Sequence, residues 1–159
     1  MSNQPPLVAS GTGKTGQTLS YLGQTAHIKV SGAETDGRYT MIEESTPPQG
    51  GPPLHAHKKE SEWFYVLEGQ FLFELDGQQT RASSGDSLFV PQGAVHTFQN
   101  AGEGPGKLLI LLEPAGPEHM FEKLDAICKQ GPPKTEYLSA LFEEFGIELH
   151  GPPLAQCGT

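Results

Sequence analysis

Residues 51–69 read GPPLHAHKKESEWFYVLEG, and this stretch carries the strongest signals in the sequence. Its aromatic and aliphatic run from Glu62 onward predicts a β-strand, and His55-Ala56-His57 places two imidazoles two residues apart. Because successive side chains of a strand point to opposite faces, both imidazoles lie on one face, within reach of one ion. Glu62 follows a predicted turn over residues 58–61, which can return its carboxylate to the same point.

A second stretch, residues 85–100, reads GDSLFVPQGAVHTFQN and adds a third imidazole. Pro91 and Gly93 predict a tight turn, and His96 opens the strand that follows, facing inward. A His-x-His pair alone is weak evidence for a metal site, because exposed histidine pairs are common. The two stretches together are much stronger evidence.

The sequence between about Thr25 and Glu113 predicts several short strands separated by turns. Asp76-Gly77 is a hairpin signal, and 20 Gly with 14 Pro is more than a helical bundle tolerates. This pattern is typical of a sandwich or jelly roll. After Pro114 the period changes, and two apolar stripes predict two short C-terminal α-helices. The stripes are Met120, Phe121, Leu124, Ile127 and Cys128, and then Leu138, Leu141, Phe142 and Phe145. We therefore expect an all-β barrel followed by two helices.

These changes of pattern divide the chain into three parts. We expect residues 1–24 to form a flexible N-terminal arm, because their first 18 residues are polar and aperiodic. Residues 25–113 are expected to form the β-barrel. Residues 114–159 are expected to form a helical segment and an extended tail packed on the barrel. Gly13-Lys14-Thr15 looks like the end of a phosphate-binding loop, but Val8 stands where that motif needs glycine, so the arm is preferred.

The charge balance limits the classes of partner. The 159 residues include 10 Lys and Arg against 19 Asp and Glu, a net charge of −9. An acidic chain repels phosphate and anionic lipid, so we expect no nucleic acid and no membrane surface as partners. Two cysteines without a disulfide framework fit a reducing compartment, and the N-terminus lacks the pattern of a secretory signal. We therefore expect a soluble, cytoplasmic protein.

Residues 55–69 and 85–100 together resemble the two sequence motifs of the cupin superfamily. The second motif matches at each defined position, whereas the first departs at its opening glycine, where Gln49 stands beside Gly50 and Gly51. The resemblance covers roughly residues 25–113 and implies a double-stranded β-helix, the jelly-roll or cupin barrel. It also implies the metal ligands His55, His57, Glu62 and His96. The aromatic run and the two helices look like the small quercetin 2,3-dioxygenase-like cupins.

Glu60 is the alternative to Glu62 as the carboxylate ligand. The motif's spacing favours Glu62, so Glu60, Lys58 and Lys59 are expected to lie in a solvated turn. The other three histidines match neither motif and are expected to be surface or packing residues: His27, His119 and His150.

Three imidazoles and one carboxylate predict one divalent transition metal ion per chain. The candidates are Fe, Mn, Ni, Co, Cu and Zn, whereas Mg and Ca are disfavoured. Such an ion can polarise a bound enolate or carbonyl. The resemblance to quercetinases implies a second, catalytic role for Glu62, which would accept a proton from a substrate hydroxyl.

Strand parity predicts a pocket around this site. The side chains expected to line it are Phe64, Val66, Phe71, Phe98 and Asn100. They would form an apolar, aromatic cavity for a flat substrate, although small barrels also fill their interiors with such side chains. Trp63, Tyr65 and Leu67 alternate with the inward set and need cover, which favours a homodimer.

The predicted function is that of a metal-dependent enzyme with a small-molecule substrate. We expect a dioxygenase that acts on a small aromatic or enolisable compound, as in quercetinases. One alternative is a non-redox isomerase, cyclase or lyase of a small metabolite. Another is a module that binds a metal or small molecule without turnover. A fold alone does not choose among them.

Overall fold

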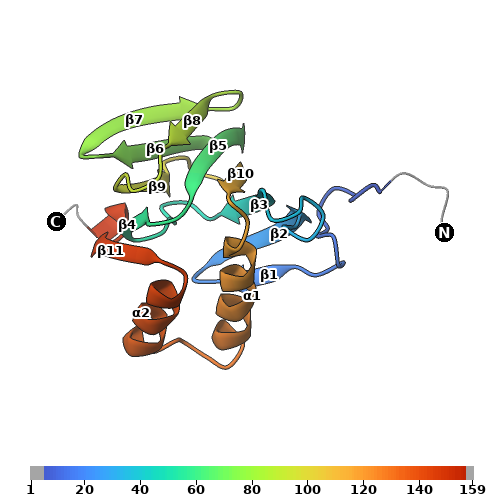
Figure 1. The fold of residues 1–159 in the computed structure, drawn as a ribbon. Helices are drawn as coiled ribbons and strands as arrows, with labels where there is room; N and C mark the ends of the chain where they lie inside the picture. The colour runs from blue at the N-terminus through green and yellow to red at the C-terminus, as the bar shows by residue number, and fades with distance from the viewer. Residues whose placement is uncertain (1–5, 157–159) are drawn as a thin grey trace.

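The structure is a computed structural model that describes residues 6–156. It contains two antiparallel sheets, followed by two helices and a final strand (Figure 1). The strands are β1 (Leu19–Tyr21), β2 (Gln24–Val30), β3 (Thr40–Thr46), β4 (Leu54–His57), β5 (Ser61–Glu68), β6 (Gln70–Leu75), β7 (Gln78–Ser83), β8 (Ser87–Val90), β9 (His96–Asn100), β10 (Gly106–Glu113) and β11 (Ile147–Gly151). The helices are α1 (Pro117–Cys128) and α2 (Thr135–Glu144), and a short 3-10 helix covers Leu154–Gln156.

The two sheets form the two walls of a barrel. The six-stranded sheet has the order β1-β2-β3-β10-β5-β8, and the five-stranded sheet has the order β11-β4-β9-β6-β7. Apart from β1, β2 and β3 and the β6–β7 pair, strands adjacent in the sequence lie in different sheets. The chain therefore crosses from one wall to the other at every connection between β3 and β6 and between β7 and β11. The predicted double-stranded β-helix with two short helices is confirmed.

The apolar core lies between the sheets. Parity along β5 is as predicted, since Glu62, Phe64 and Val66 are buried whereas Trp63 and Tyr65 are only half-buried. Phe64 from one sheet meets Phe73 and Phe98 from the other, with ring centroids 5.3 and 5.6 Å apart. This interlocking of aromatic rings fixes the spacing of the two walls.

Both helices cover one side of the barrel, below β1 and β11 in the view of Figure 1. Pro117 begins α1, a position where a missing N–H is harmless. The Glu118 carboxylate accepts hydrogen bonds from the amides of Gly116 and Gly32, at 2.7 and 2.9 Å, and so ties α1 to the loop after β2. Phe121 stacks on Tyr21 of β1 with centroids 5.1 Å apart.

The N-terminal part differs from the expected loose arm over residues 1–24. Leu19–Tyr21 pairs with β2, and Leu19 and Tyr21 are buried. A strand this short has no detectable alternation, and α1 supplies the surface that buries it. The strand β7 forms the hairpin with β6 that Asp76-Gly77 indicated, although its sequence QQTRAS is almost entirely polar and lies exposed at the edge of its sheet.

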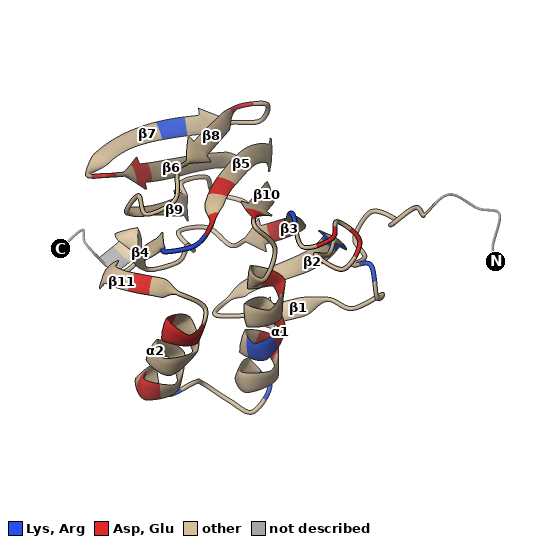
Figure 2. Ribbon diagram, viewed as in Figure 1, with Lys and Arg blue, Asp and Glu red and all other residues tan. Residues whose placement is uncertain are grey.

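Charged residues are spread unevenly over the elements. Figure 2 shows Asp and Glu on both helices, on β11 and on β5, and a basic turn between β4 and β5. That turn is tied to β11, because Lys58 N donates to the Gly146 carbonyl at 2.9 Å and Lys58 Nζ lies 3.3 Å from Glu148. Within residues 6–156, no helix combines the length and the apolar character needed to cross a membrane.

Candidate metal centre

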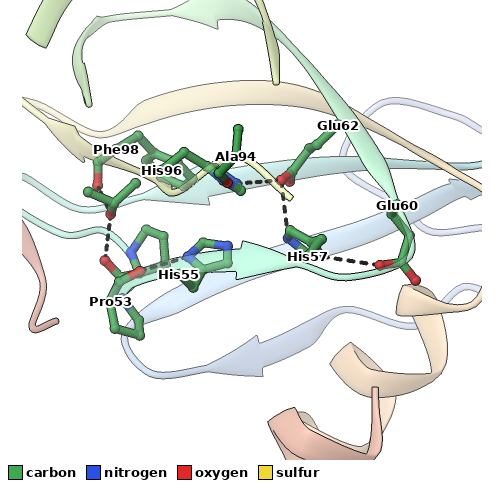
Figure 3. A network of polar contacts seen from close by, with 10 residues as sticks. Pro53, His55, His57, Glu60, Glu62, Ala94, His96 and Phe98 are labelled. Carbon is green, nitrogen blue, oxygen red and sulfur yellow. Dashed lines mark hydrogen bonds and ion pairs between the residues drawn. The ribbon is translucent and has the colours of Figure 1, made fainter. Parts of the chain in front are cut away.

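Four side chains meet at one point between the two sheets (Figure 3). They are His55, His57, Glu62 and His96, and each offers one ligand atom within 4.8 Å of the others. The three histidines come from β4 and β9 of one sheet, and Glu62 comes from β5 of the other. The structure therefore brings together all four residues that the sequence motifs indicated.

Strand geometry explains this convergence. His55 and His57 share one face of β4, with Ala56 between them on the opposite face, and His55 pairs in register with His96 of β9. Glu62 Oε2 then closes the group from the opposite wall, 2.9 Å from His96 Nε2 and 3.3 Å from His57 Nε2.

The hydrogen bonds of the imidazoles suit a cation at this point. His55 Nδ1 lies 2.7 Å from the Pro53 carbonyl, and His96 Nδ1 lies 3.0 Å from the Ala94 carbonyl. A carbonyl only accepts, so each Nδ1 donates to its carbonyl and each Nε2 is the nitrogen turned toward the centre. Nε2 of His96 lies 2.9 Å from the carboxylate of Glu62. A divalent ion between them would satisfy both, and the four residues therefore fit a transition metal.

The charges of the group are strongly coupled. Burial alone would raise the pKa of Glu62, but the charge of His57 and hydrogen bonds from His57 and His96 hold it far below its usual range. Burial would lower the pKa of His57, but the Glu62 and Glu60 carboxylates raise it to about 9. Burial and the other two imidazoles lower the pKa of His55 to about 3. The centre thus holds an ionised carboxylate among imidazoles.

Glu60 is not in a solvated turn, and that expectation was wrong. Its side chain is only 6% exposed, and its Oε2 lies 3.4 Å from His57 Nδ1. The turn after β4 is held to β11, and this orients Glu60 toward the histidine, while Lys58 and Lys59 remain exposed as predicted. A carboxylate behind a ligating imidazole fixes the ring and increases its basicity. No periodic signal connects two residues across a turn, so the sequence could not show this contact.

A cavity of about 260 Å³ opens onto three of the four residues, His55, His57 and Glu62. Its walls are mainly apolar: Phe64, Phe98 and Ile110 from the barrel, and Met120, Phe121, Leu124 and Phe142 from the helices. Of the predicted pocket residues, only Phe64 and Phe98 reach this wall. The helix residues were expected only to pack, because an amphipathic stripe does not reveal whether it covers a core or a cavity.

The other three predicted pocket residues lie elsewhere, which corrects that expectation. Val66 and Phe71 are fully buried in the core and do not line the cavity. Asn100 is also fully buried, and its amide donates to the carbonyls of Thr46 and Gly104 at 2.9 and 2.8 Å. Strand parity predicted that these side chains face inward, but it does not show which of them reach the cavity.

The remaining histidines lie outside the centre. His27 contacts Thr18 at 3.0 Å, His119 lies 3.6 Å from Glu122, and His150 lies 3.4 Å from Glu148. These contacts agree with the expected surface or packing roles.

Comparison with known proteins gives the same family for the barrel. Residues 42–112 match the family model of the cupin domain. The chain is 33% identical over 76 residues to quercetin 2,3-dioxygenase of Bacillus subtilis. The matched stretch covers 48% of this chain and 23% of that protein. It is 34% identical over 79 residues to an oxalate-binding protein of Thermotoga maritima, covering 50% of this chain and 65% of that protein. The chain thus spans less than two thirds of either relative.

Solved structures share the fold. The structure of KdgF from Halomonas sp. superimposes with a TM-score of 0.58 at 19% identity, over 65% of this chain and 92% of that one. A predicted oxalate decarboxylase from Thermotoga maritima superimposes with a TM-score of 0.55 at 23% identity, over 57% and 80% of the two chains. With the barrel topology, the two motifs and the family match, residues 42–112 of this chain are a cupin domain.

Proposed function

We propose that this chain is a metal-dependent cupin enzyme, most simply a dioxygenase that acts on a small aromatic or enolisable compound. The observation that carries the proposal is the position of the four-residue centre, three of whose members line a mainly apolar cavity. A divalent ion held by His55, His57, Glu62 and His96 would act as a Lewis acid on an enolate or carbonyl oxygen. The resemblance to quercetin 2,3-dioxygenase supports the choice of chemistry.

The protein's own residues would supply binding and proton transfer. Phe64 and Phe98 offer flat apolar surfaces for a ring, and the residues from α1 and α2 exclude water from it. Glu62 is ionised and lines the cavity, so it can accept a proton from a substrate hydroxyl. We therefore propose Glu62 both as a ligand and as the catalytic base.

The test is the Glu62→Gln variant. An amide can still offer an oxygen to the metal but cannot accept the proton, so the single-turnover rate per bound metal should fall by about 10²- to 10⁴-fold. The substrate to use is 3-hydroxychromone, which carries an enol and a carbonyl on two fused rings, with dioxygen uptake as the readout. An unchanged rate per bound metal would leave Glu62 as a ligand only.

A second candidate is a non-redox isomerase, cyclase or lyase. It is favoured by another buried carboxyl in the same cavity, that of Glu44, whose pKa burial raises to about 7 and which is therefore poised for proton transfer. Conversion of the compound without dioxygen uptake, with Fe, Mn, Co, Ni and Cu loaded in turn, would select this class.

We also propose that two copies associate through the outer face of the six-stranded sheet. Register places five apolar side chains in one row across it: Phe89, Trp63, Leu111, Met41 and Val30. Phe89, on the edge strand β8, is 59% exposed. A row of this kind favours a partner with the same apolar surface. Light scattering at micromolar concentration should give the mass of a dimer, and Phe89→Glu should shift it toward that of a monomer.

A further inference from the structure

A second polar pair lies in the cavity, apart from the metal centre. It consists of Tyr21 on β1 and Glu44 on β3, whose side chains are 4% and 3% exposed and both line the cavity. The Tyr21 hydroxyl donates to Glu44 Oε2 at 2.6 Å. Among the described residues, Glu44 Oε1 has no hydrogen bond of good geometry, although the Thr46 hydroxyl two residues further along β3 is near enough to lower the pKa of the Glu44 carboxyl.

This pair is an unusual element of a barrel interior. A buried carboxyl with a bare oxygen is destabilising, because buried polar groups normally have their hydrogen bonds made. Nor is the pair needed to attach β1. The amide of Ser20 already donates to Asp125 of α1 at 2.9 Å, and Tyr21 stacks on Phe121. A buried, perturbed carboxyl in a cavity is instead typical of a site that meets a ligand.

Strand register places the pair at the opposite end of the cavity from the metal centre. On β10, Leu112 is the partner of Glu62 and Leu108 is the partner of Glu44. These two positions are four residues apart, or about 13 Å of backbone. Phe64 and Ile110, paired with each other, line the space between. The cavity therefore has a polar group at each end and apolar walls in the middle.

We infer that Tyr21 and Glu44 form a second binding site in the cavity. Glu44 accepts a hydrogen bond there from a hydroxyl group of a ligand, and the metal centre holds the other end of that ligand. The inference rests on the proposed function and narrows its substrate class. The ligand has a metal-binding enol or carbonyl at one end and a hydroxyl at the other. It has one ring or two fused rings, because the cavity of about 260 Å³ is slightly smaller than the pockets that hold drug-sized ligands. A carboxylate at the far end is disfavoured, because it would lie against Glu44.

The test compares 3-hydroxychromone with its four derivatives that carry one further hydroxyl at position 5, 6, 7 or 8. Binding is measured with zinc-loaded protein, so that no oxidation competes. At least one derivative should bind about 10- to 100-fold more tightly than the parent, as expected for a hydrogen bond to a charged group. In Glu44→Gln the amide nitrogen replaces the free acceptor, so the ratio of the dissociation constants of the parent and of that derivative should fall to about one.

A ligand change tests the same contact without altering the protein. Fluorine in place of the extra hydroxyl keeps the size and removes the donor, so the advantage should be lost in the wild-type protein too. The inference is overturned if no derivative binds better than the parent, if the fluoro compound keeps the advantage, or if Glu44→Gln weakens all ligands equally, as a purely structural role would require. A parent compound that binds no better with zinc than without would instead contradict the proposed role of the metal centre.

Discussion

Strands β5 and β9 begin at the metal centre and end in the packed part of the barrel. Their first residues contribute metal ligands, whereas their last residues contribute to the core. At the beginning, Glu62 and His96 face each other at 2.9 Å as part of the four-residue centre. At the end, Val66 lies in the apolar core and Asn100 makes its hydrogen bonds with backbone carbonyls. Along each strand, the inward-facing positions thus change from metal binding to core packing within five residues. Changes at the two ends should separate metal binding from stability.

Removing a ring at the packed end should have the largest effect on stability. Phe71 is fully buried, pairs in register with Asn100 and packs against Gly106. Phe71→Ala should lower the free energy of unfolding by about 3–5 kcal/mol, through lost burial and the cavity left behind. The metal content per folded chain should not change. Denaturant unfolding and metal analysis measure the two quantities, with the exposed Tyr137→Ala as the control. Loss of metal from the folded variant would show that the two ends are coupled.

Removing a ligand at the other end should have the converse effect. Four-ligand zinc sites in small domains bind with about 10–16 kcal/mol, so one ligand is worth roughly 3–4 kcal/mol, or about 10²- to 10³-fold in affinity. His57→Ala should therefore lose most of its metal at micromolar concentration. His150→Ala, whose ring lies near Glu148 away from the centre, should bind metal normally. Equal losses in both variants would mean that the wrong histidines have been identified.

The sequence predicted the beginnings of these strands better than their ends. The spacing of His55, His57, Glu62 and His96 was enough to identify the centre, because strand parity and two turns determine where those side chains point. Strand parity did not show which inward-facing side chains line the cavity, and Val66 and Asn100 were therefore placed in the pocket. The contribution of α1 and α2 to the cavity wall was also not predicted, since their residues show the same apolar stripe whether they cover a core or a cavity. Glu60 and Glu44 gave no signal, because each depends on contacts between segments with no common period.

The Tyr21–Glu44 pair should make stability depend on pH in the metal-free protein. The pKa of the Glu44 carboxyl is raised from 4.5 to about 7, mainly by burial, so the folded state binds more protons than the unfolded state between these values. Stability is therefore lost as pH rises through this window, at most about 1.4 kcal/mol per pH unit and up to about 3 kcal/mol in total.

Glu44→Gln cannot ionise and should lack this loss. Relative to wild type, it should gain about 2–3 kcal/mol between pH 4.5 and pH 8, measured as the difference in unfolding free energy between the two proteins. The other groups that titrate are common to both proteins, including Glu62, whose charge also raises the pKa of Glu44. A difference that does not vary with pH would place the Glu44 carboxyl in a solvated or fully paired environment.

The contact between Glu60 and His57 should have an effect at the metal end only. Glu60→Gln keeps the size of the side chain but removes the charge behind the ligand, so metal affinity should fall by about 10- to 100-fold. Glu68→Gln, at the exposed end of β5, is the matched control. Stability of the metal-free protein should change much less than metal affinity. A normal affinity in Glu60→Gln would reduce Glu60 to a packing residue of the turn.

The smallest effect concerns the turn that docks on the end of β9. Gln49 stands where the first motif has its opening glycine, and its φ is 63°, in the left-handed region. Its amide donates to the Asn100 carbonyl at 2.9 Å, so the turn is held in this conformation although the side chain is exposed. A residue with a Cβ loses about 1–2 kcal/mol there, whereas glycine loses about 0.4–1 kcal/mol through the greater freedom of its unfolded chain. Gln49→Gly should therefore raise the free energy of unfolding by less than about 1 kcal/mol, with metal affinity unchanged. Gln49→Ala retains the strain and is the matched control. An alanine variant as stable as the glycine variant would show that the turn does not use the left-handed conformation, and that the missing glycine alters the packed end of the barrel in another way.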